Sequence, residues 1–350
     1  MTPAPDHDSA ARSASTDADR PAVLVLMGGP DAEREISIES GRAISDALRQ
    51  ADRCDVIEQV IDQPSAEDIA AMGGDVIFPA LHGRWGEGGP LQDVLEQVGR
   101  PYVGARPDAA FLTMDKLASK RAVEAIGVPT PPACLLGPDD ACTIDPPLVL
   151  KPVDDGSSVD LRVCRTHDEV AAARAELHSK RPTLLAERFI AGRELTVGVL
   201  DDRVLPIVEV IPADGTYDFA AKYERNDTRY VVDPDLGPAI GERLIAFSRR
   251  AFEALGSRDV ARMDFLLSDE VSTRGVWFLE VNTMPGFTSH SLFPMAAARA
   301  GLEMPALCQR LVDAALSRRN DSGVDASNGV MVHTTPQSRQ DSHTPSKASR

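Results

Sequence analysis

Short apolar runs alternate with segments of helical periodicity in the first third of the chain. Residues 22–27 (AVLVLM) form a continuous apolar run that ends at a Gly-Gly pair, and a helical pattern continues to residue 50. A second run at 75–78 (DVIF) precedes a further helical segment at 91–98. A buried strand, a glycine turn and a helix in this order are typical of an α/β unit.

The middle of the chain predicts helices separated by short strands. A long helical pattern covers 108–127 and ends where three prolines stand close together, because proline cannot continue a helix. A strand is expected at 147–152, ending in a Lys-Pro pair, and an alanine-rich helix at 167–179. Thr166 before that helix and Glu169 three residues later predict a capping box at its start.

From residue 183 onward, strand patterns dominate the globular part. These are expected at 183–187, 195–200, 204–211, 260–267 and 276–282. A loop at 214–233 and a helix at 238–255 separate the last two strands from the others, and a loop and a helix follow them. The chain is therefore expected to fold as an α/β (α+β) protein.

Composition divides this globular part from its ends. The polar segments 1–20 and 320–350 carry few large apolar residues and are expected to be disordered tails. The length of the remainder allows two or three domains. We divide it into three α/β domains, an N-terminal one at 21–105, a central one at 106–190 and a C-terminal one at 191–319.

Charge and cysteine usage narrow the class of protein. The 350 residues carry a formal net charge of −17, whereas a nucleic-acid-binding protein is normally basic. Five irregularly spaced cysteines without a C-x-x-C motif are typical of reduced thiols in the cytoplasm. No apolar run reaches the roughly 18 residues that cross a membrane, and the polar N-terminus is not a signal peptide. We expect a cytoplasmic protein with no nucleic-acid or membrane partner.

Two strand patterns near the end of the globular part carry charged and amide side chains. Arg262 and Asp264 share one face of the strand at 260–267, because strand side chains alternate, and Glu280 and Asn282 share a face of the next strand. If the strands are neighbours, one cation and three oxygen ligands converge, and oxygen ligands suit Mg²⁺. The alternative is a set of solvated strand residues or structural ion pairs.

Candidate phosphate-binding groups occur without a standard phosphate-binding motif. Lys151 ends a strand pattern, Lys116 begins a helical one, and Gly156 with its two following serines forms a loop whose amides and hydroxyls suit phosphates. The chain has no G-x-x-x-x-G-K-[ST] motif and no kinase motif set. These residues indicate an ATP-using enzyme of another class, although each lysine alone is more often a solvated one.

Eight segments, taken together and in order, resemble the D-alanine–D-alanine ligases. They are 28–37 (GGPDAEREIS), 82–92 (HGRWGEGGPLQ), 114–116 (MDK), 151–152 (KP), 156–159 (GSSV), 221–223 (AKY), 262–264 (RMD) and 280–292 (EVNTMPGFTSHSL). The resemblance implies an ATP-grasp fold with ATP between the central and C-terminal domains. It also implies that ATP phosphorylates one D-alanine, whose acylphosphate is attacked by the amine of a second D-alanine. The dipeptide feeds peptidoglycan synthesis, and a homodimer is the family expectation.

The resemblance further implies a set of nucleotide and metal contacts. ATP is expected to meet Lys116, Lys151, Ser158, Glu187, Phe189, Ile190, Glu194 and Lys222. Two Mg²⁺ (or Mn²⁺) ions are expected at Asp264, Glu280 and Asn282. Phosphoryl transfer needs such groups because its catalysis consists mainly of positioning and charge neutralisation.

A second set of residues is implied to handle the two amino acids. Glu33 pairs with the first ammonium group, Arg262 and the Gly286 amide stabilise the tetrahedral oxyanion, and Ser157 and Tyr223 connect Glu33 to a mobile loop. The substrate-binding residues are His82, Ser291 and Leu292. The alternative for Tyr223 is the role of a packing aromatic.

The sequence departs from the family pattern at two places. Asp160 stands where a glycine usually follows Gly-Ser-Ser-Val, and Pro30 and Asp31 replace small hydroxyl residues. Two alternative functions remain open at this point. One is a related ligase that uses D-serine or D-lactate as second substrate, and the other is a non-catalytic nucleotide-binding homologue.

Overall fold

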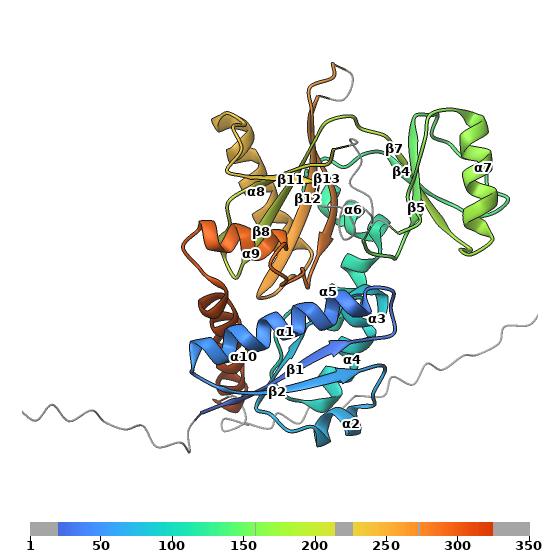
Figure 1. The fold of residues 1–350 in the computed structure, drawn as a ribbon. Helices are drawn as coiled ribbons and strands as arrows, with labels where there is room; N and C mark the ends of the chain where they lie inside the picture. The colour runs from blue at the N-terminus through green and yellow to red at the C-terminus, as the bar shows by residue number, and fades with distance from the viewer. Residues whose placement is uncertain (1–19, 158, 214–226, 272–273, 325–350) are drawn as a thin grey trace, which may run out of the picture.

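The computed structural model describes residues 20–157, 159–213, 227–271 and 274–324, without the side chains of 319–324. In these residues the strands form three sheets that follow one another along the chain (Figure 1). The first sheet is parallel, and the other two are antiparallel.

The first sheet accounts for the apolar run at the start of the chain. β1 (Ala22–Gly28) lies between β2 (Asp55–Ile61) and β3 (Val76–Pro79) and is parallel to both. Helices cover both faces, so alternate residues of β1 enter different cores: Val25 packs with α1, and Leu24 packs with α4. The helices of this part are α1 (Arg34–Ala51), α2 (Ala66–Ala71), α3 (Gly83–Glu87) and α4 (Pro90–Val98).

The second sheet has four strands in the order β4-β7-β5-β6, with α7 packed on one side of it. Two helices, α5 (Pro107–Met114) and α6 (Lys116–Ala125), lead into it from the first part of the chain. The other elements are β4 (Ala133–Leu136), β5 (Leu148–Pro152), β6 (Arg162–Cys164), α7 (His167–His178) and β7 (Leu184–Arg188).

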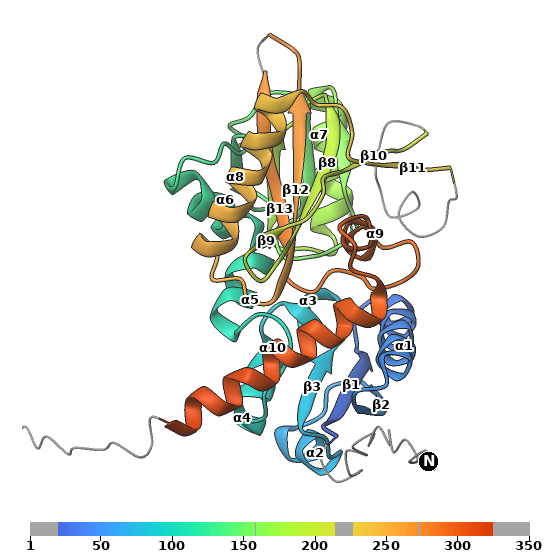
Figure 2. The ribbon, with the colours of Figure 1, turned by 90° about the vertical axis from the view of Figure 1, so that its left-hand side faces the viewer.

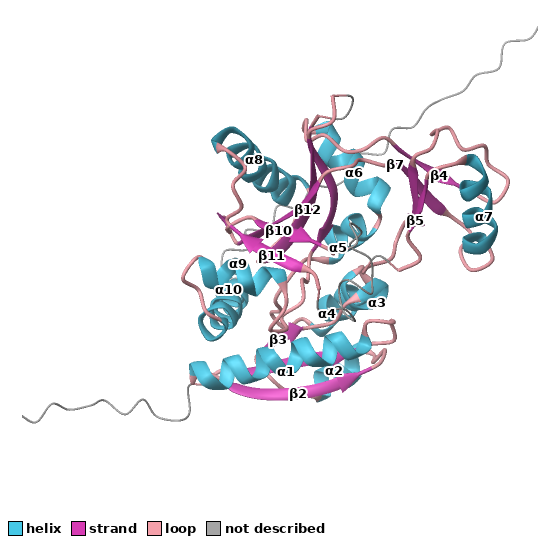
Figure 3. Ribbon diagram, turned by 45° about the horizontal axis from the view of Figure 1, so that its top comes forward, coloured by secondary structure: helices cyan, strands magenta, loops and turns pink. Residues whose placement is uncertain are grey.

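The third sheet carries the strands on which sequence patterns placed the charged residues. Its order is β11-β10-β8-β12-β13, with β9 paired to β8, and α6 and α8 pack on it in a shared core. The two antiparallel sheets lie on either side of α6 (Figure 3). The elements are β8 (Arg193–Leu200), β9 (Arg203–Val204), β10 (Val208–Ile211), β11 (Arg229–Val232), α8 (Pro238–Ala254), β12 (Val260–Ser268) and β13 (Gly275–Asn282).

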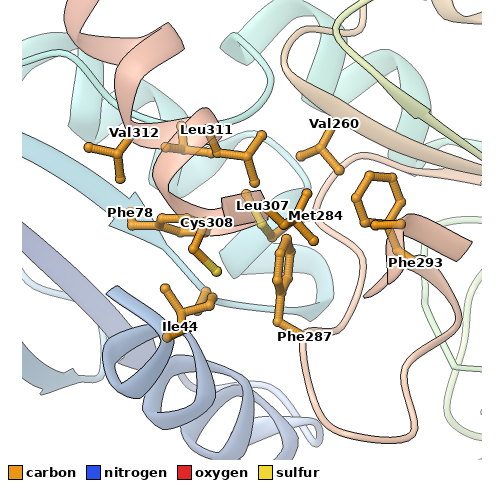
Figure 4. Packing of buried hydrophobic residues seen from close by; sticks show 14 of the residues in the cluster. Ile44, Phe78, Val260, Met284, Phe287, Phe293, Leu307, Cys308, Leu311 and Val312 are labelled. Atoms are coloured by element: carbon orange, nitrogen blue, oxygen red, sulfur yellow. The ribbon is translucent and has the colours of Figure 1, made fainter. Parts of the chain in front are cut away.

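The end of the chain returns to the first sheet. After α9 (Leu292–Arg299), α10 (Met304–Val324) runs beside β3 and α1 (Figure 2). One core therefore contains Phe78 from β3, Val260 from β12 and Leu311 from α10 (Figure 4). Residues far apart in the sequence share this core, so the N-terminal and C-terminal parts are packed together.

Several predicted elements differ from the observed ones. The single helix expected at 108–127 is broken at Asp115, which caps α6 by accepting a hydrogen bond from the Ala118 amide. The strand expected at 204–211 is split into β9 and β10, and β11 lies inside the loop expected at 214–233. Strand β2 was not predicted, and α10 continues past residue 319 to Val324.

The capping box predicted for α7 is only half formed. Thr166 accepts a hydrogen bond from the Glu169 amide at 3.2 Å, as expected for an N-cap residue. The Glu169 carboxylate accepts from the amide of Arg165 rather than from that of Thr166. The start of the helix was therefore correct, but its reciprocal contact reaches one residue further back.

Candidate active site

The charged residues of the two last strands meet as the alternation of side chains predicted. β12 and β13 are antiparallel neighbours, with Arg262 opposite Asn282 and Asp264 opposite Glu280. The register shifts directly after Asp264. The polar pairs lie on one side of this shift, and mainly apolar pairs, such as Phe265 with Phe278, lie on the other. The expected convergence of one cation and three oxygen-bearing side chains is confirmed.

Cations face the carboxylates of this group. Arg262 bonds Asp264 through two nitrogens, with Nε–Oδ1 at 3.0 Å and Nη2–Oδ2 at 2.9 Å, and Thr196 donates its hydroxyl to the same carboxylate at 2.6 Å. Lys116 Nζ lies 3.5 Å from Glu280 Oε2. Each of the two carboxylates is therefore faced by a cation within the site.

The donor set of these strands suits a hard divalent cation. Among the described residues no three His, Cys, Asp or Glu side chains are grouped for a metal. Asp264 and Glu280 nevertheless supply two carboxylates from directly paired positions, and Asn282 supplies an amide oxygen. Mg²⁺ binds through one or two carboxylates together with phosphate and water oxygens, so the residues present fit it.

A cavity of about 690 Å³ opens between the first part of the chain and the third sheet. It brings together residues from α1, α3, β13 and the start of α9, which are distant in sequence. Its charged and polar lining includes Glu33, His82, Glu87, Lys116, Asp155, Ser157, Arg262, Glu280, Asn282 and Ser291.

A second cavity of about 460 Å³ lies between the two antiparallel sheets. Its lining includes Lys151, Glu187, Phe189, Ile190, Glu194, Asp264 and Leu266. Four residues line both cavities, namely Lys116, Asp155, Gly156 and Glu280. The cavities therefore adjoin, and a cation, a carboxylate and a loop with a glycine stand at their junction.

A buried group of three charges lies at the wall of the second cavity, which Lys151 and Glu187 line. Glu187 lies between Lys120, at 2.6 Å, and Lys151, at 3.2 Å. Burial alone would raise the pKa of Glu187, but the two ammonium groups outweigh it and hold the pKa below its usual value. Burial lowers the pKa of Lys120, which its attraction to Glu187 only partly offsets. The carboxylate is therefore kept ionised and acts only as a hydrogen-bond acceptor.

The loop after β5 reaches the first part of the chain. Ser157 donates its hydroxyl to the carboxylate of Glu33. A Cβ at Gly156 would lie 3.1 Å from Glu33 Oε2, so a side chain there would crowd the carboxylate. Ser157 itself has φ of 53°, in the left-handed region. Glycine thus permits the close approach on which this contact depends.

His82 is a buried, uncharged member of the first cavity. Its Nδ1 lies 3.1 Å from the Met284 carbonyl oxygen, which makes Nδ1 the donor, and its Nε2 then accepts from the Ser40 hydroxyl at 3.3 Å. Burial lowers the pKa of His82 to about 4. The ring is therefore neutral near pH 7 and holds the strand-to-helix segment after β13 against α1.

Glu87 is a second buried titratable group in this cavity. It accepts hydrogen bonds from the backbone amides of Gly83, at 3.3 Å, and Met284, at 3.4 Å. Burial, reinforced by the nearby charge of Glu33, raises the pKa of Glu87 to about 8. The carboxyl group is therefore largely protonated at neutral pH.

The segment between β13 and α9 closes the first cavity. Ser291 is the N-cap residue of α9, and its hydroxyl accepts a hydrogen bond from the Thr288 amide at 3.0 Å. A Cβ at Gly286 would lie 2.7 Å from the Ser291 hydroxyl oxygen. Gly286 and Ser291 are thus close, and both line the cavity beside Leu292.

Known proteins resemble this chain in sequence and in fold. A family model described as D-ala D-ala ligase C-terminus matches residues 141–313. The D-alanine–D-alanine ligase of Bordetella pertussis is 40% identical over 315 residues, covering 87% of this chain and 98% of that protein. That of Syntrophotalea carbinolica is 39% identical over 304 residues, covering 85% of this chain and 97% of that protein.

The chain belongs to the D-alanine–D-alanine ligase family. A solved ligase of this name from Bacillus anthracis, complexed with ATP, superposes with a TM-score of 0.75 at 27% identity, covering 87% of this chain and all of that chain. One from Coxiella burnetii gives 0.73 at 26% identity, covering 89% and 98%. The expected ATP-grasp fold is confirmed. Among the described residues, no helix is long and apolar enough to cross a membrane.

The residues singled out by resemblance to the ligase family fall into the two cavities. The first cavity is lined by Glu33, His82, Lys116, Ser157, Arg262, Glu280, Asn282, Gly286, Ser291 and Leu292. The second is lined by Lys116, Lys151, Glu187, Phe189, Ile190, Glu194, Asp264 and Glu280. Three further residues, Ser158, Lys222 and Tyr223, lie outside the described residues.

Three charged residues of the site were not predicted from the sequence. Glu87 lies within the motif at 82–92, where its carboxyl was available as a signal. Lys120 follows Lys116 by four residues and so lies on the same face of α6. Asp155 directly precedes Gly156 and lines both cavities. In each case only the packing of distant elements distinguishes the residue from a solvated charge.

Proposed function

We propose that this chain ligates two D-alanine molecules to D-alanyl-D-alanine at the expense of ATP. The observation that carries the proposal is the junction of two cavities at Lys116 and Glu280 in a member of the D-alanine–D-alanine ligase family. One cavity suits a nucleotide and the other suits two small amino acids. Their common wall is where a phosphoryl group passes from one to the other.

The reaction balances in two steps. A carboxylate oxygen of the first D-alanine attacks the terminal phosphorus of ATP, so that ADP leaves and an acylphosphate forms. The amine of the second D-alanine attacks the acyl carbon, the C–N bond forms, and the C–O bond to phosphate breaks. The ammonium group of the second D-alanine loses one proton before it attacks and another as the amide forms; both go to water or buffer, and inorganic phosphate is the second product.

The second cavity is the proposed ATP site. Lys116 and Lys151 would neutralise phosphate charge, and the ionised Glu187 would accept a hydrogen bond from the adenine amino group. Glu194 would bind the ribose hydroxyls, and backbone groups of Phe189 and Ile190 would border the base. That a solved Bacillus anthracis relative is complexed with ATP supports this assignment. Ser158 and Lys222 are proposed as further phosphate contacts.

Asp264, Glu280 and Asn282 are the proposed ligands of two Mg²⁺ (or Mn²⁺) ions. When bound, these ions would supply positive charge at the transferring phosphoryl group. The protein contributes a rigid pair of adjacent strands and a preformed set of oxygen donors. Arg262 holds Asp264 in orientation on one side, and Thr196 does so on the other.

The first cavity is the proposed site of both amino acids. Glu33 would pair with the ammonium group of the first D-alanine, near the neutral His82. Arg262 and the Gly286 amide would stabilise the oxyanion of the tetrahedral intermediate, whose charge develops in the transition state. The remaining proposed contacts are Ser291 and Leu292, for the second carboxylate, and Ser157 and Tyr223, which would close the site against water.

We further propose the assembly that accompanies this function. The domains at 21–105, 106–190 and 191–319 would form the ligase, with ATP between the central and C-terminal ones and with polar tails at 1–20 and 320–350. The enzyme would work as a cytoplasmic homodimer in peptidoglycan precursor synthesis. Light scattering tests the dimer directly.

A substrate panel tests the proposed reaction. Purified protein is supplied with Mg²⁺ and ATP and with D-alanine alone, with D-alanine together with D-serine or D-lactate as second substrate, or with L-alanine alone. We expect D-alanine alone to release phosphate and dipeptide in equal amounts, and L-alanine to give neither. A preference for D-serine or D-lactate would replace the second substrate in the proposal. Absence of turnover with every substrate would favour the non-catalytic homologue and contradict the proposed function.

A further inference from the structure

The loop between β5 and β6 is held by one arginine at both of its ends. Arg181 Nη2 lies 2.6 Å from the carboxylate of Asp155 and 3.3 Å from that of Asp160. Lys180 adds a contact to Asp160 at 3.4 Å. Arg181 is itself fixed just after α7, where its backbone amide donates to the Leu177 carbonyl at 2.9 Å.

The same loop carries contacts that face the junction of the two cavities. The backbone carbonyl of Asp155 accepts a hydrogen bond from Lys116 Nζ, and Asp155 and Gly156 line both cavities. Ser157 donates to the carboxylate of Glu33, and both residues line the first cavity. The carboxylates of the loop thus contact the segment just after α7 (the outer contacts), and its Asp155 carbonyl and Ser157 hydroxyl contact the site (the inner contacts). A change in the outer contacts would alter where the inner ones stand.

Asp160 occupies a backbone conformation that favours glycine. Its φ is 57°, in the left-handed region, and a side chain there is strained unless it forms compensating contacts. Its carboxylate is only 14% exposed and meets both Arg181 and Lys180. The ion pairs provide a contact that glycine at this position would lack.

We propose that Arg181 is a positioning residue, which fixes the β5–β6 loop over the nucleotide by bridging Asp155 and Asp160. The proposal rests on the proposed ligase function and deepens it. Fully exposed ion pairs contribute little, but the carboxylates here are 23% and 14% exposed and share one guanidinium group. One nitrogen, Nη2, contacts both carboxylates, so removal of this single group releases Asp155 and Asp160 together.

A matched control lies in the same part of the molecule. Arg162 on β6 also forms an ion pair with a residue of α7, its Nη2 lying 2.5 Å from Glu176. Both side chains are more exposed, at 40% and 47%, and neither lines a cavity. Arg162→Ala therefore removes the same charge, together with a bond to the Leu161 carbonyl at the end of the loop, but leaves the ion pairs of Asp155 and Asp160 in place.

Steady-state kinetics of Arg181→Ala and Arg162→Ala test the proposal. We expect Arg181→Ala to raise the KM for ATP about tenfold, the change that corresponds to about 1.4 kcal/mol. It should also increase the phosphate released per dipeptide, because a loosened loop admits water to the acylphosphate. Arg162→Ala should leave both values within about twofold, and Arg181→Lys should restore part of the loss.

Two further comparisons keep the outcome decisive. If Arg181→Ala does not fold, Asp160→Asn replaces it, with a smaller rise in the KM for ATP expected because Asp155 keeps its ion pair. Equal effects of Arg181→Ala and Arg162→Ala, or no effect of either, would overturn the positioning role. A parent protein that makes no dipeptide overturns the proposed function instead. The loop is then judged by the Kd for a non-hydrolysable ATP analogue, measured in the same variants.

Discussion

Glu87 shows how burial changes the chemistry of a single side chain. Its pKa is raised to about 8 by burial and by the charge of Glu33. A raised pKa in the folded state contributes stability that is present below the unfolded value of 4.5 and is lost as pH rises through 8. The folded state disfavours the ionised carboxylate of Glu87, which forms above that pH.

We predict that Glu87→Gln gains stability relative to the parent as pH rises. Glutamine keeps the shape of the protonated group and does not titrate, so the difference should be small near pH 4.5 and grow to a plateau above about pH 8. Urea unfolding at several pH values measures it. Glu242→Gln, an exposed change on α8, serves as the control. Parallel curves for the two variants would show that Glu87 does not titrate with a raised pKa.

Arg262 orients Asp264 through two hydrogen bonds, and we propose that it also stabilises the oxyanion. We predict that Arg262→Ala lowers kcat for dipeptide formation by about 10²–10³-fold, because the contact to the oxyanion is strongest in the transition state. The Kd for a non-hydrolysable ATP analogue should change by less than about tenfold. Stopped assays and analogue titration measure the two effects. Arg262→Lys, which retains the charge but loses the bidentate bond to Asp264, should be intermediate, and an unchanged kcat would refute the role.

At this scale the sequence predicts side chains whose position follows from a short-range rule. Arg262 and Asp264 could be placed on one face because strand geometry repeats every two residues. Glu87 and Lys120 could not be assigned to the site in this way, since their roles depend on partners that are far away in the chain. Lys120 is 1% exposed only because β7 brings Glu187 to α6, and nothing in a single sequence reports that pairing.

The boundary between α5 and α6 sets the position of Lys116, which lines both cavities. Helical periodicity runs through 108–127, yet Asp115 leaves the helical region with ψ of 104° and caps α6 through its side chain. A short acidic side chain competes for backbone amides and so favours a cap over a helix interior. The break places Lys116 at the first position of α6, where its backbone amide bonds the Val153 carbonyl at 2.9 Å.

We predict that removing this cap affects both stability and nucleotide use. Asp115→Ala should lower the free energy of unfolding by about 1 kcal/mol and raise the KM for ATP, because it loosens the turn that carries Lys116. Thr166→Ala removes the equivalent cap of α7 and should cost about the same stability without changing that KM. Thermal unfolding and steady-state assays of both variants check the pair. A similar KM in both would mean that the cap has no part in placing Lys116.

Other element errors share a physical cause. β2 escaped prediction because it is an edge strand whose residues are mostly half-buried or exposed, so it lacks an apolar run. β11 is likewise a short edge strand with intermediate burial, in a region that reads as loop. Central strands such as β1 are covered on both faces, and their composition alone identifies them. The sequence pattern therefore predicts strands with an apolar, buried run, including the edge strands β3 and β13, better than short or exposed edge strands.

At the scale of the whole molecule, α10 joins the beginning of the chain to its end. Its apolar residues complete the core beside α1 and β3. Its last described side chain, Arg318, bonds Asp259 through two nitrogens at 2.6 and 2.9 Å and the Tyr102 carbonyl at 2.9 Å. Asp259 also accepts the Gly104 amide at 2.8 Å. This contact between distant segments fixes the first part of the chain against the third sheet, and hence the walls of the first cavity.

We predict that Arg318→Ala destabilises the protein by about 2–3 kcal/mol, because it leaves the buried Asp259 carboxylate with only part of its hydrogen bonds. The matched control is Arg310→Ala, on the same helix, whose pair with Asp201 at 2.9 Å is more exposed and should contribute about 0–1 kcal/mol. Urea unfolding measures both. Because the contact also sets the first cavity, Arg318→Ala should raise the KM for the amino-acid substrate, while Arg310→Ala should not. Equal destabilisation by the two variants would show that Asp259 does not depend on Arg318, and that the packing of α10 alone holds the two ends of the chain together.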